Sequence, residues 1–393
     1  MRYSLIIIAL LSFAPNVFAQ QNNTENTSVE VVETPSNTES VDKAELTEEE
    51  LNTKVFAAVD AGDIETLTPL LDAMIYYKHN EKGHTALTQA IENENVELAK
   101  LLTQEAVINL KNTAGETPLT LAIKKGNVEI MNLVAVRAKA SLKNGTGEAP
   151  LFLALETGQD LKFLSKLIKK GADIDRLSNG ETPLALAVSM NELKKVAYLL
   201  KQGADVSKVN GNGDSPLYIA TVKGYDLIAG MLLHKSEDAV GDVNWESDLG
   251  EPLLNIAAES NNASLVATML EFGADVTKTD YMENTALNIA AKNGNKEMVE
   301  VLIANGSDPN HTNMMGSTAI MLAAKNGHQE IANMLAENGG NPEIRNYEGV
   351  SASQYANFDA IMAKRYSEET EVMLDEYGQT KQVDNGLYNY DDQ

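Results

Sequence analysis

Histidine and acidic side chains are the residues of this sequence best suited to chemistry, and neither kind forms a recognisable site. No two of the five histidines have the spacing of metal ligands on one helix, and none lies in an H-E-x-x-H motif. The acidic runs Glu48–Glu50 and Asp391–Asp392 are typical of a helix start and a solvated tail. We therefore expect no catalytic, metal or cofactor site, and no enzyme. The histidines are His79, His84, His234, His311 and His328.

Composition narrows the functional classes further. The sequence contains no cysteine, which excludes disulfide frameworks, thiolate zinc sites and cysteine nucleophiles. The net charge of −26 argues against nucleic acid, which needs a basic surface, and against adhesion to anionic lipid. Half of that charge lies in two terminal stretches, because residues 20–50 carry a net −8 and residues 364–393 a net −5. The middle of the chain is only mildly acidic, so charge alone says little about its partners.

The N-terminus has the pattern of a secretory signal peptide. Arg2 precedes an apolar run from Leu5 to Ala14, and the sequence Val17-Phe18-Ala19 resembles a cleavage site. The run is shorter than the roughly 18 apolar residues of a membrane span, so a retained anchor is the weaker alternative. We expect a signal peptide over residues 1–19 that is cleaved after Ala19. The mature protein would then be periplasmic or secreted, with no stable membrane insertion.

A period of about 33 residues organises the middle of the chain. The motif is Gly, any residue, Thr, Pro or Ala, and Leu, as in G-E-T-P-L from Gly115. Successive copies are separated by 32, 32, 33, 33, 37, 33, 33 and 33 residues. Such regularity indicates stacked structural repeats. The copies, some of them degenerate, begin at Gly83, Gly115, Gly147, Gly180, Gly213, Gly250, Glu283, Gly316 and Gly349.

Each copy carries the signals of a helix pair. The hydroxyl of Thr117, Thr182 or Ser215 can cap the first helix, and the proline that follows suits the first helical position. A left-handed residue is expected after that helix, at Gly126, Gly158, Asn191, Gly224, Asn261, Gly294 and Gly327, and Glu94 at the equivalent position is the exception. Three residues before the motif, a side-chain oxygen can accept the N–H groups of a tight turn. These residues are Asn80, Asn112, Asn144, Asn210, Asp280, Asn313 and Asn346.

The motif T-P-L-x-x-A, with G-N-V-E-I from Gly126 and G-A-D-V from Gly203, resembles ankyrin repeats over about residues 50–360. The resemblance implies an all-α solenoid of stacked helix–turn–helix units with projecting β-turn fingers. The expected parts are a disordered acidic linker over 20–43, a repeat domain over 44–366 and an acidic disordered tail over 367–393. Within the domain we expect an N-terminal cap over 44–79, eight repeats over 80–345 and a degenerate C-terminal cap over 346–366.

Two features depart from the family pattern. Ankyrin repeats often have His after T-P-L, and the hydrogen bonds of that His are not expected here because other residues take its place. Four extra residues within 234–249 should open the loop before the sixth finger. The residues in the His slot are Thr88, Thr120, Phe152, Ala185, Tyr218, Asn255, Asn288 and Met321.

The resemblance implies that partners contact the finger tips. Tips are small or polar in the early fingers and apolar in the later ones, and successive tips stack. The alternative is that these side chains pack finger against finger or lie under the tail. Tyrosine and methionine suit an adaptable binding surface, so we expect one apolar stripe that Trp245, beside the insertion, can extend. The stripe residues are Leu249, Tyr281, Met282, Met314, Met315 and Tyr347.

These observations favour a monomeric, non-catalytic protein–protein interaction module with a protein partner and no nucleic acid. It would act in the periplasm or outside the cell as a scaffold, an inhibitor or a chaperone-like binder. The alternatives are an immunity-type inhibitor of a toxin enzyme and a secreted effector that acts on host proteins. An enzyme or a sugar-binding protein is a weaker reading, because fold alone does not decide function.

Overall fold

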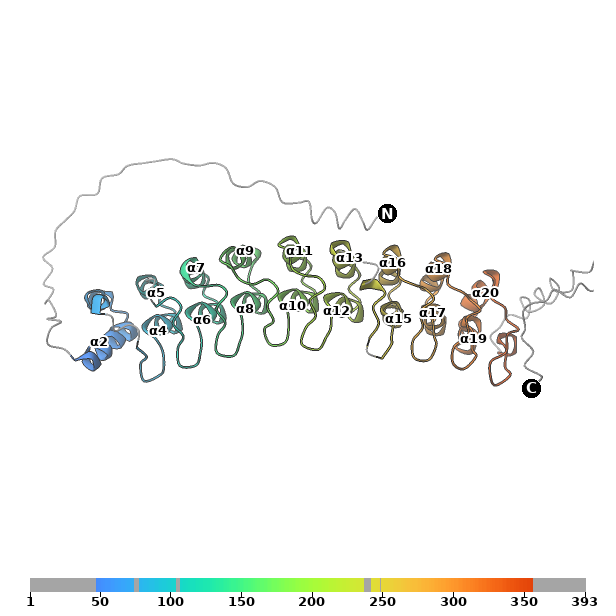
Figure 1. Cartoon of the computed structure of the whole chain (residues 1–393), viewed down its shortest axis with the longest axis horizontal. Coiled ribbons are helices and arrows are strands. Elements are labelled where there is room, and N and C mark those ends of the chain that lie inside the picture. Colours follow the sequence, from blue (N-terminus) through green and yellow to red (C-terminus); the bar gives the residue numbers. More distant parts are fainter. Residues whose placement is uncertain (1–46, 74–77, 104–106, 237–241, 248, 356–393) are drawn as a thin grey trace, which may run out of the picture. The chain divides into compact units, whose positions relative to one another are not determined.

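The computed structural model describes residues 47–73, 78–103, 107–236, 242–247 and 249–355 (Figure 1). The predicted signal peptide over 1–19, the linker over 20–43 and the tail over 367–393 lie outside these ranges. The chain divides into two compact units, one ending at Ile219 and one beginning at Ala220. They are described separately below, and helix α12 (Pro216–Val222) spans the boundary between them.

Unit 1 is a stack of helix pairs in two rows. The first helices form one row and the second helices form the other, with the fingers projecting beyond the first row (Figure 1). Each first helix packs against its own partner and against the first helix of the next repeat. The first row is α2 (Glu48–Ala61), α4 (Ala86–Glu92), α6 (Pro118–Lys125), α8 (Pro150–Glu156) and α10 (Pro183–Ser189). The second row is α3 (Ile64–Leu67) with the 3-10 turn Thr68–Ala73, α5 (Val96–Leu102), α7 (Val128–Arg137), α9 (Leu161–Lys169) and α11 (Leu193–Lys201).

Unit 2 repeats the same two-row arrangement. Helix α17 packs against α15, α18 and α19, while α16 packs against α13 and α18. The unit contains α13 (Asp226–Lys235), α15 (Leu253–Glu259), α16 (Ala263–Glu271), α17 (Ala286–Asn293), α18 (Lys296–Ala304), α19 (Ala319–Lys325), α20 (Gln329–Glu337) and the 3-10 turn Ala352–Gln354. Sheet-like pairing in the described part of the chain consists of isolated antiparallel bridges, such as Thr279 with Thr285. The predicted all-α repeat class is confirmed within each unit.

Small and branched apolar residues make the thin core between helix rows. Ala90, Ala122 and Ala154 are fully buried at equivalent positions of α4, α6 and α8, so neighbouring helices approach closely. Leu87 and Leu119 are buried beside them. A layered core of this kind requires few aromatic residues, which agrees with an aromatic content of 5%. No described helix has both the length and the apolar character needed to cross a membrane.

The predicted helix boundaries are confirmed at the atoms that set them. The Thr117 hydroxyl oxygen accepts the Thr120 N–H at 3.1 Å, and the Ser215 hydroxyl oxygen accepts the Tyr218 N–H at 3.1 Å. All seven Gly and Asn residues predicted to turn the chain after the first helix have positive φ. Glu94 adopts this conformation with φ 52° although it is neither Gly nor Asn. The repeat register therefore fixes the backbone here more strongly than residue preference does.

The N-terminal cap departs from the other repeats in its first helix. Helix α2 has 14 residues where α4 has seven, and a capping box between Thr47 and Glu50 begins it. The extra turns precede the part of α2 that aligns with α4. The first described finger of unit 1, Asn80–Gly83, therefore lies beside a helix and not beside another described finger.

Candidate functional site

Seven of the fingers are held by an Asn or Asp side chain at their base. Asn313 Oδ1 accepts the N–H groups of Met315 at 3.0 Å and Ser317 at 2.9 Å. Asp280 Oδ1 accepts those of Met282 and Asn284, both at 2.8 Å. The predicted role of the residue three before the motif is confirmed in all seven fingers that carry Asn or Asp there. The tip side chains therefore project from a fixed turn.

The finger tips of unit 2 are joined through their backbones. The Met314 N–H donates to the Met282 carbonyl oxygen at 2.9 Å, and the Tyr347 N–H donates to the Met315 carbonyl oxygen at 3.2 Å. These bonds place the Asp280, Asn313 and Asn346 fingers side by side. Tip residues that are far apart in sequence thus form one row.

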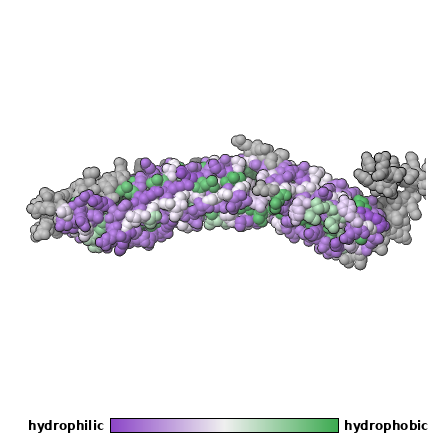
Figure 2. Space-filling model, turned by 60° about the horizontal axis from the view of Figure 1, so that its bottom comes forward, coloured by the Kyte–Doolittle hydropathy of each residue, from purple (hydrophilic) through white to green (hydrophobic). Residues whose placement is uncertain are grey.

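This row exposes large apolar side chains. Tyr347 is 80% exposed and Tyr281 is 69% exposed, and Leu249 in the preceding finger is 78% exposed. Met314 and Met315 are about half exposed. Soluble proteins seldom expose apolar side chains in one contiguous group without a binding role. Figure 2, which turns the fingers forward, shows hydrophobic surface among hydrophilic surface in the part of the molecule that carries unit 2.

Two of the predicted stripe residues lie differently from the rest. Met282 is half-buried, whereas Tyr281 and Glu283 on either side of it are exposed. It therefore adds less exposed surface to the row than the other tip residues do. Trp245 is 36% exposed and lies before the sixth finger, where its backbone carbonyl oxygen accepts the Leu253 N–H at 3.1 Å. It therefore flanks the base of that finger and not its tip.

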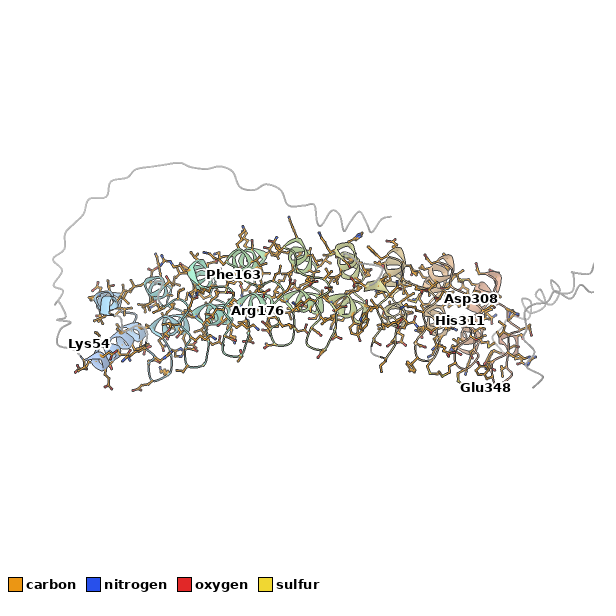
Figure 3. The ribbon with its side chains drawn as sticks, viewed as in Figure 1. Lys54, Phe163, Arg176, Asp308, His311 and Glu348 are labelled. Atoms are coloured by element: carbon orange, nitrogen blue, oxygen red, sulfur yellow. The ribbon has the colours of Figure 1, made fainter. Side chains whose placement is uncertain are left out.

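The rim of this surface is acidic. Glu283 and Glu348 are exposed at the tips, and Figure 3 shows Glu348 beyond the helix rows. Burial, followed by the charges of Glu259 and Asp280, raises the pKa of the Glu251 carboxyl, which indicates negative potential on this face. The nearby cations are engaged. Lys278 bonds the Asn244 carbonyl oxygen and Glu246, and Arg345 donates to the Gly349 carbonyl oxygen at 2.7 Å.

The fingers of unit 1 have a different surface. The Gly145 N–H donates to the Gly115 carbonyl oxygen at 2.7 Å, and a Cβ added to Gly115 would lie 2.6 Å from the Gly145 Cα. These tips are in backbone contact, which only glycine allows. Small tips are therefore a packing requirement in unit 1, whereas unit 2 carries large side chains outward.

A polar network lies along the fingers of unit 1. The Lys124 ammonium bonds Glu116 at 2.7 Å and Glu148 at 2.8 Å. The Lys124 bond, against the effect of burial and with further bonds from Asn144, Asn179 and Thr146, lowers the pKa of the Glu148 carboxyl to about 2. The charges of this network are satisfied internally, so it indicates a structural role.

Sequence reasoning missed the exposed apolar residues of unit 1, two of which lie in its fingers. Leu177 is 41% exposed and Val209 is 45% exposed. Leu177 stands where other fingers have Asn or Asp, and its finger closes instead by two bonds of 2.9 Å between Ser178 and Glu181. The Asn179-Gly180 pair, both with positive φ, forms that turn. Asn-Gly is the sequence signal that identifies such a hairpin.

The histidines connect neighbouring repeats. The Nε2 atoms of His79, His311 and His328 lie 2.9, 2.8 and 3.1 Å from the carbonyl oxygens of Lys111, Glu283 and Lys292. Figure 3 shows His311 near the helices, away from the tip residue Glu348. Nowhere in the described ranges do three or more His, Cys, Asp or Glu side chains cluster as metal ligands would.

Comparison with known proteins gives the family. A protein-family model of ankyrin repeats in three copies matches residues 55–144, 132–210, 151–244 and 254–346. These matches cover well over half of the 393 residues. No curated protein matches the chain. Ankyrin repeats indicate a protein–protein interaction module, and proteins built from them are generally non-catalytic. The chain belongs to the ankyrin repeat family.

Proposed function

We propose that this chain is an exported ankyrin-repeat protein that binds a protein partner through the finger tips of unit 2. The binding surface is the stripe made by Leu249, Tyr281, Met314, Met315 and Tyr347, with Met282 beneath it. The observation that carries the proposal is that Tyr281, Met314, Met315 and Tyr347 are exposed on three fingers joined by backbone hydrogen bonds, while the exposed Leu249 belongs to the finger that precedes them. Because the finger backbones are already held in place, binding through this row costs little backbone entropy.

The chemistry of the stripe favours a particular kind of partner. An apolar segment would cover the tyrosine and methionine side chains, which are typical interface anchors. Basic residues beside that segment would face Glu283 and Glu348. Two cations of the same fingers, Lys278 and Arg345, are already engaged in bonds of their own. Complementary charge of this kind accelerates association more than it adds affinity.

Export is supported by the N-terminal sequence alone. A charged start, an apolar run and a small residue at Ala19 are what a secretory signal peptide requires. The mature chain then meets its partner in the periplasm or outside the cell. N-terminal sequencing of the chain recovered from its native compartment tests this part directly, and a protein that still begins at Met1 would contradict it.

Site-specific photo-crosslinking tests the binding surface. A photoreactive residue at Met315 should capture a discrete partner in the native compartment, which mass spectrometry then identifies. The matched control carries the same residue at Asn212, an exposed tip of unit 1. Equal capture of the same partner from both positions, or no discrete product from Met315, would remove the stripe from the proposal.

The identity of the captured partner separates the possible roles. An enzyme whose activity falls on addition of the purified chain indicates an immunity-type inhibitor. A host protein indicates an effector. A partner whose activity is unchanged, but which is kept soluble or is joined to a third protein, indicates a chaperone-like binder or a scaffold.

A further inference from the structure

A pocket lies at the N-terminal end of unit 1, between α2 and the first described finger. Its volume is about 340 Å³. Phe56 and Ala57 form its apolar part, and polar side chains of Asp60 and Lys82 stand at its rim. This volume is at the low end of the roughly 300–1,000 Å³ range of ligand pockets, so it accommodates a short stretch of extended chain. The remaining lining residues are Asn52, Thr53, Asn80 and Glu81.

The pocket stands where the backbone ladder between fingers is open. The N–H groups of Thr113 and Gly145 donate to carbonyl oxygens of the preceding finger, at 2.8 and 2.7 Å. Glu81 holds the same position in its own finger, directly after the Asn at the base. Its N–H has no hydrogen-bond acceptor among the residues that the structure describes. The first finger therefore presents an unused donor, as the edge strand of a sheet does.

Asn52 lies on the opposite wall of the pocket. Its Oδ1 atom is buried and has no hydrogen-bond donor within the described part of the chain. An unsatisfied buried polar atom is unfavourable, so a rotation that brings this oxygen to a donor is favoured. An extended peptide backbone supplies a carbonyl oxygen for the Glu81 N–H, and it supplies an N–H for Asn52 once the Asn52 side chain turns its oxygen toward the pocket.

We propose that residues 37–46 of this same chain run beside the first finger as an extended strand, with the short stretch around Val41 in the pocket. The segment ends directly at Thr47, which caps α2. From Thr47 to Asn52 the helix rises about 7.5 Å, and from Thr47 to Asp60 about 20 Å, at 1.5 Å per residue. An extended chain covers the longer distance in about six residues at roughly 3.3 Å each. Ten residues are therefore enough to turn at Thr47 and follow α2 along the pocket.

The side chains of this segment match the lining. Residues 37–46 read N-T-E-S-V-D-K-A-E-L, with Val41 suited to the apolar surface of Phe56 and Ala57. Val41, Lys43 and Glu45 share one face of an extended strand. On that face Lys43 suits the Asp60 and Glu81 carboxylates, and Glu45 suits the Lys82 ammonium. A tethered segment also competes at the high effective concentration of a short linker, roughly millimolar, against any free peptide.

Disulfide trapping tests the proposal, since the chain has no cysteine of its own. In the full chain, Val41→Cys with Glu81→Cys should form a disulfide at least about tenfold faster than Val41→Cys with Asn212→Cys. Asn212 is an exposed finger tip farther along unit 1. Equal rates for the two pairs would overturn the proposal. A dimeric product would also overturn it, because a second copy would then be the occupant.

Hydrogen exchange gives a second readout that requires no cysteine. Replacing residues 37–46 by a Gly-Ser segment of equal length keeps the chain intact while removing the matching side chains. The Glu81 amide should then exchange at least about tenfold faster, whereas the Thr113 amide, bonded within the ladder, should be unchanged. An unchanged Glu81 amide in a chain that remains folded would contradict the assignment.

Discussion

The Met314 N–H donates to the Met282 carbonyl oxygen at 2.9 Å, while the Met314 side chain remains about half exposed. The backbone therefore aligns these two fingers, and the exposed side chain is not what joins them. The same holds between Met315 and Tyr347, whose backbones bond at 3.2 Å. Folding and binding are consequently separable in unit 2, because the exposed tip side chains can be changed without loss of the finger row.

Met314→Ser combined with Tyr347→Ser tests that separation. Exposed side chains contribute little to folding, so the free energy of unfolding should change by less than about 0.5 kcal/mol per substitution. Capture of the partner should fall at least about tenfold, since two interface anchors are removed. The control is Leu177→Ser with Val209→Ser, which removes similarly exposed apolar side chains from fingers of unit 1. If both doubles reduce capture equally, the stripe does not define the interface.

Gly115→Ala should destabilise unit 1 more than Gly126→Ala. Both glycines have left-handed φ, 81° and 77°, so both variants carry a backbone cost of about 1–2 kcal/mol. Only at Gly115 would the new methyl group lie 2.6 Å from a backbone atom, whereas nothing lies within 4 Å at Gly126. The added clash should cost about 1–3 kcal/mol more. Urea unfolding of the two variants measures the difference, and equal values would show that the fingers separate freely.

The repeat period allowed much of the backbone to be predicted from sequence. It located the left-handed turns at the Gly and Asn positions after the first helices. Glu94 is the expected exception because of its residue type, and the structure shows that it adopts the same left-handed conformation. The period also located the capping oxygens at the finger bases, because a residue at a fixed distance from the motif has the same hydrogen-bonding role in each repeat. In a periodic structure, residues at equivalent positions of the repeat have similar conformations and contacts. The structure agrees with the sequence-based prediction wherever the chain keeps the period.

The remaining features depend on how neighbouring repeats meet. In unit 1 no described finger precedes Asn80, and α2 with its extra turns lies beside the first finger instead. The pocket between them depends on this arrangement of two elements, which no single sequence motif predicts. Met282 is half-buried although its type and position match the exposed Met315. Burial of a tip side chain depends on the two fingers that flank it. The sequence therefore identified the residues of the stripe but not how exposed each of their side chains is.

Asn255 shows how this chain replaces a histidine that ankyrin repeats commonly carry. Its Nδ2 donates to the Asn284 carbonyl oxygen in the next repeat at 2.8 Å, and its side chain is fully buried. Asn255→Ala should lower the free energy of unfolding by about 1–3 kcal/mol, because the bond is lost and a buried site is emptied. Asn255→His, which retains an N–H donor, should recover at least half of that loss in thermal or urea unfolding. Equal losses for Ala and His would mean that shape, and not this bond, decides the position.

The Glu148 carboxylate should make the stability of unit 1 depend on acid pH. Its pKa falls from an ordinary value of 4.5 to about 2 in the folded chain, chiefly through the Lys124 ammonium. A depressed folded pKa gives stability that is fully present above pH 4.5 and is lost as the pH falls toward 2.

By that linkage, the contribution of Glu148 to the free energy of unfolding should be about 2 kcal/mol smaller at pH 3 than at pH 6. Glu148→Gln keeps the shape of the side chain and removes its charge. Between pH 6 and pH 3, the free energy of unfolding of this variant should therefore fall by about 2 kcal/mol less than that of the unsubstituted chain. Urea unfolding at the two pH values measures the difference. Glu330→Gln is the matched control, because its carboxylate also pairs with a lysine of another repeat but is largely exposed, and exposed pairs contribute little. An identical pH dependence for Glu148→Gln and the unsubstituted chain would show that the Lys124 network does not stabilise the fingers.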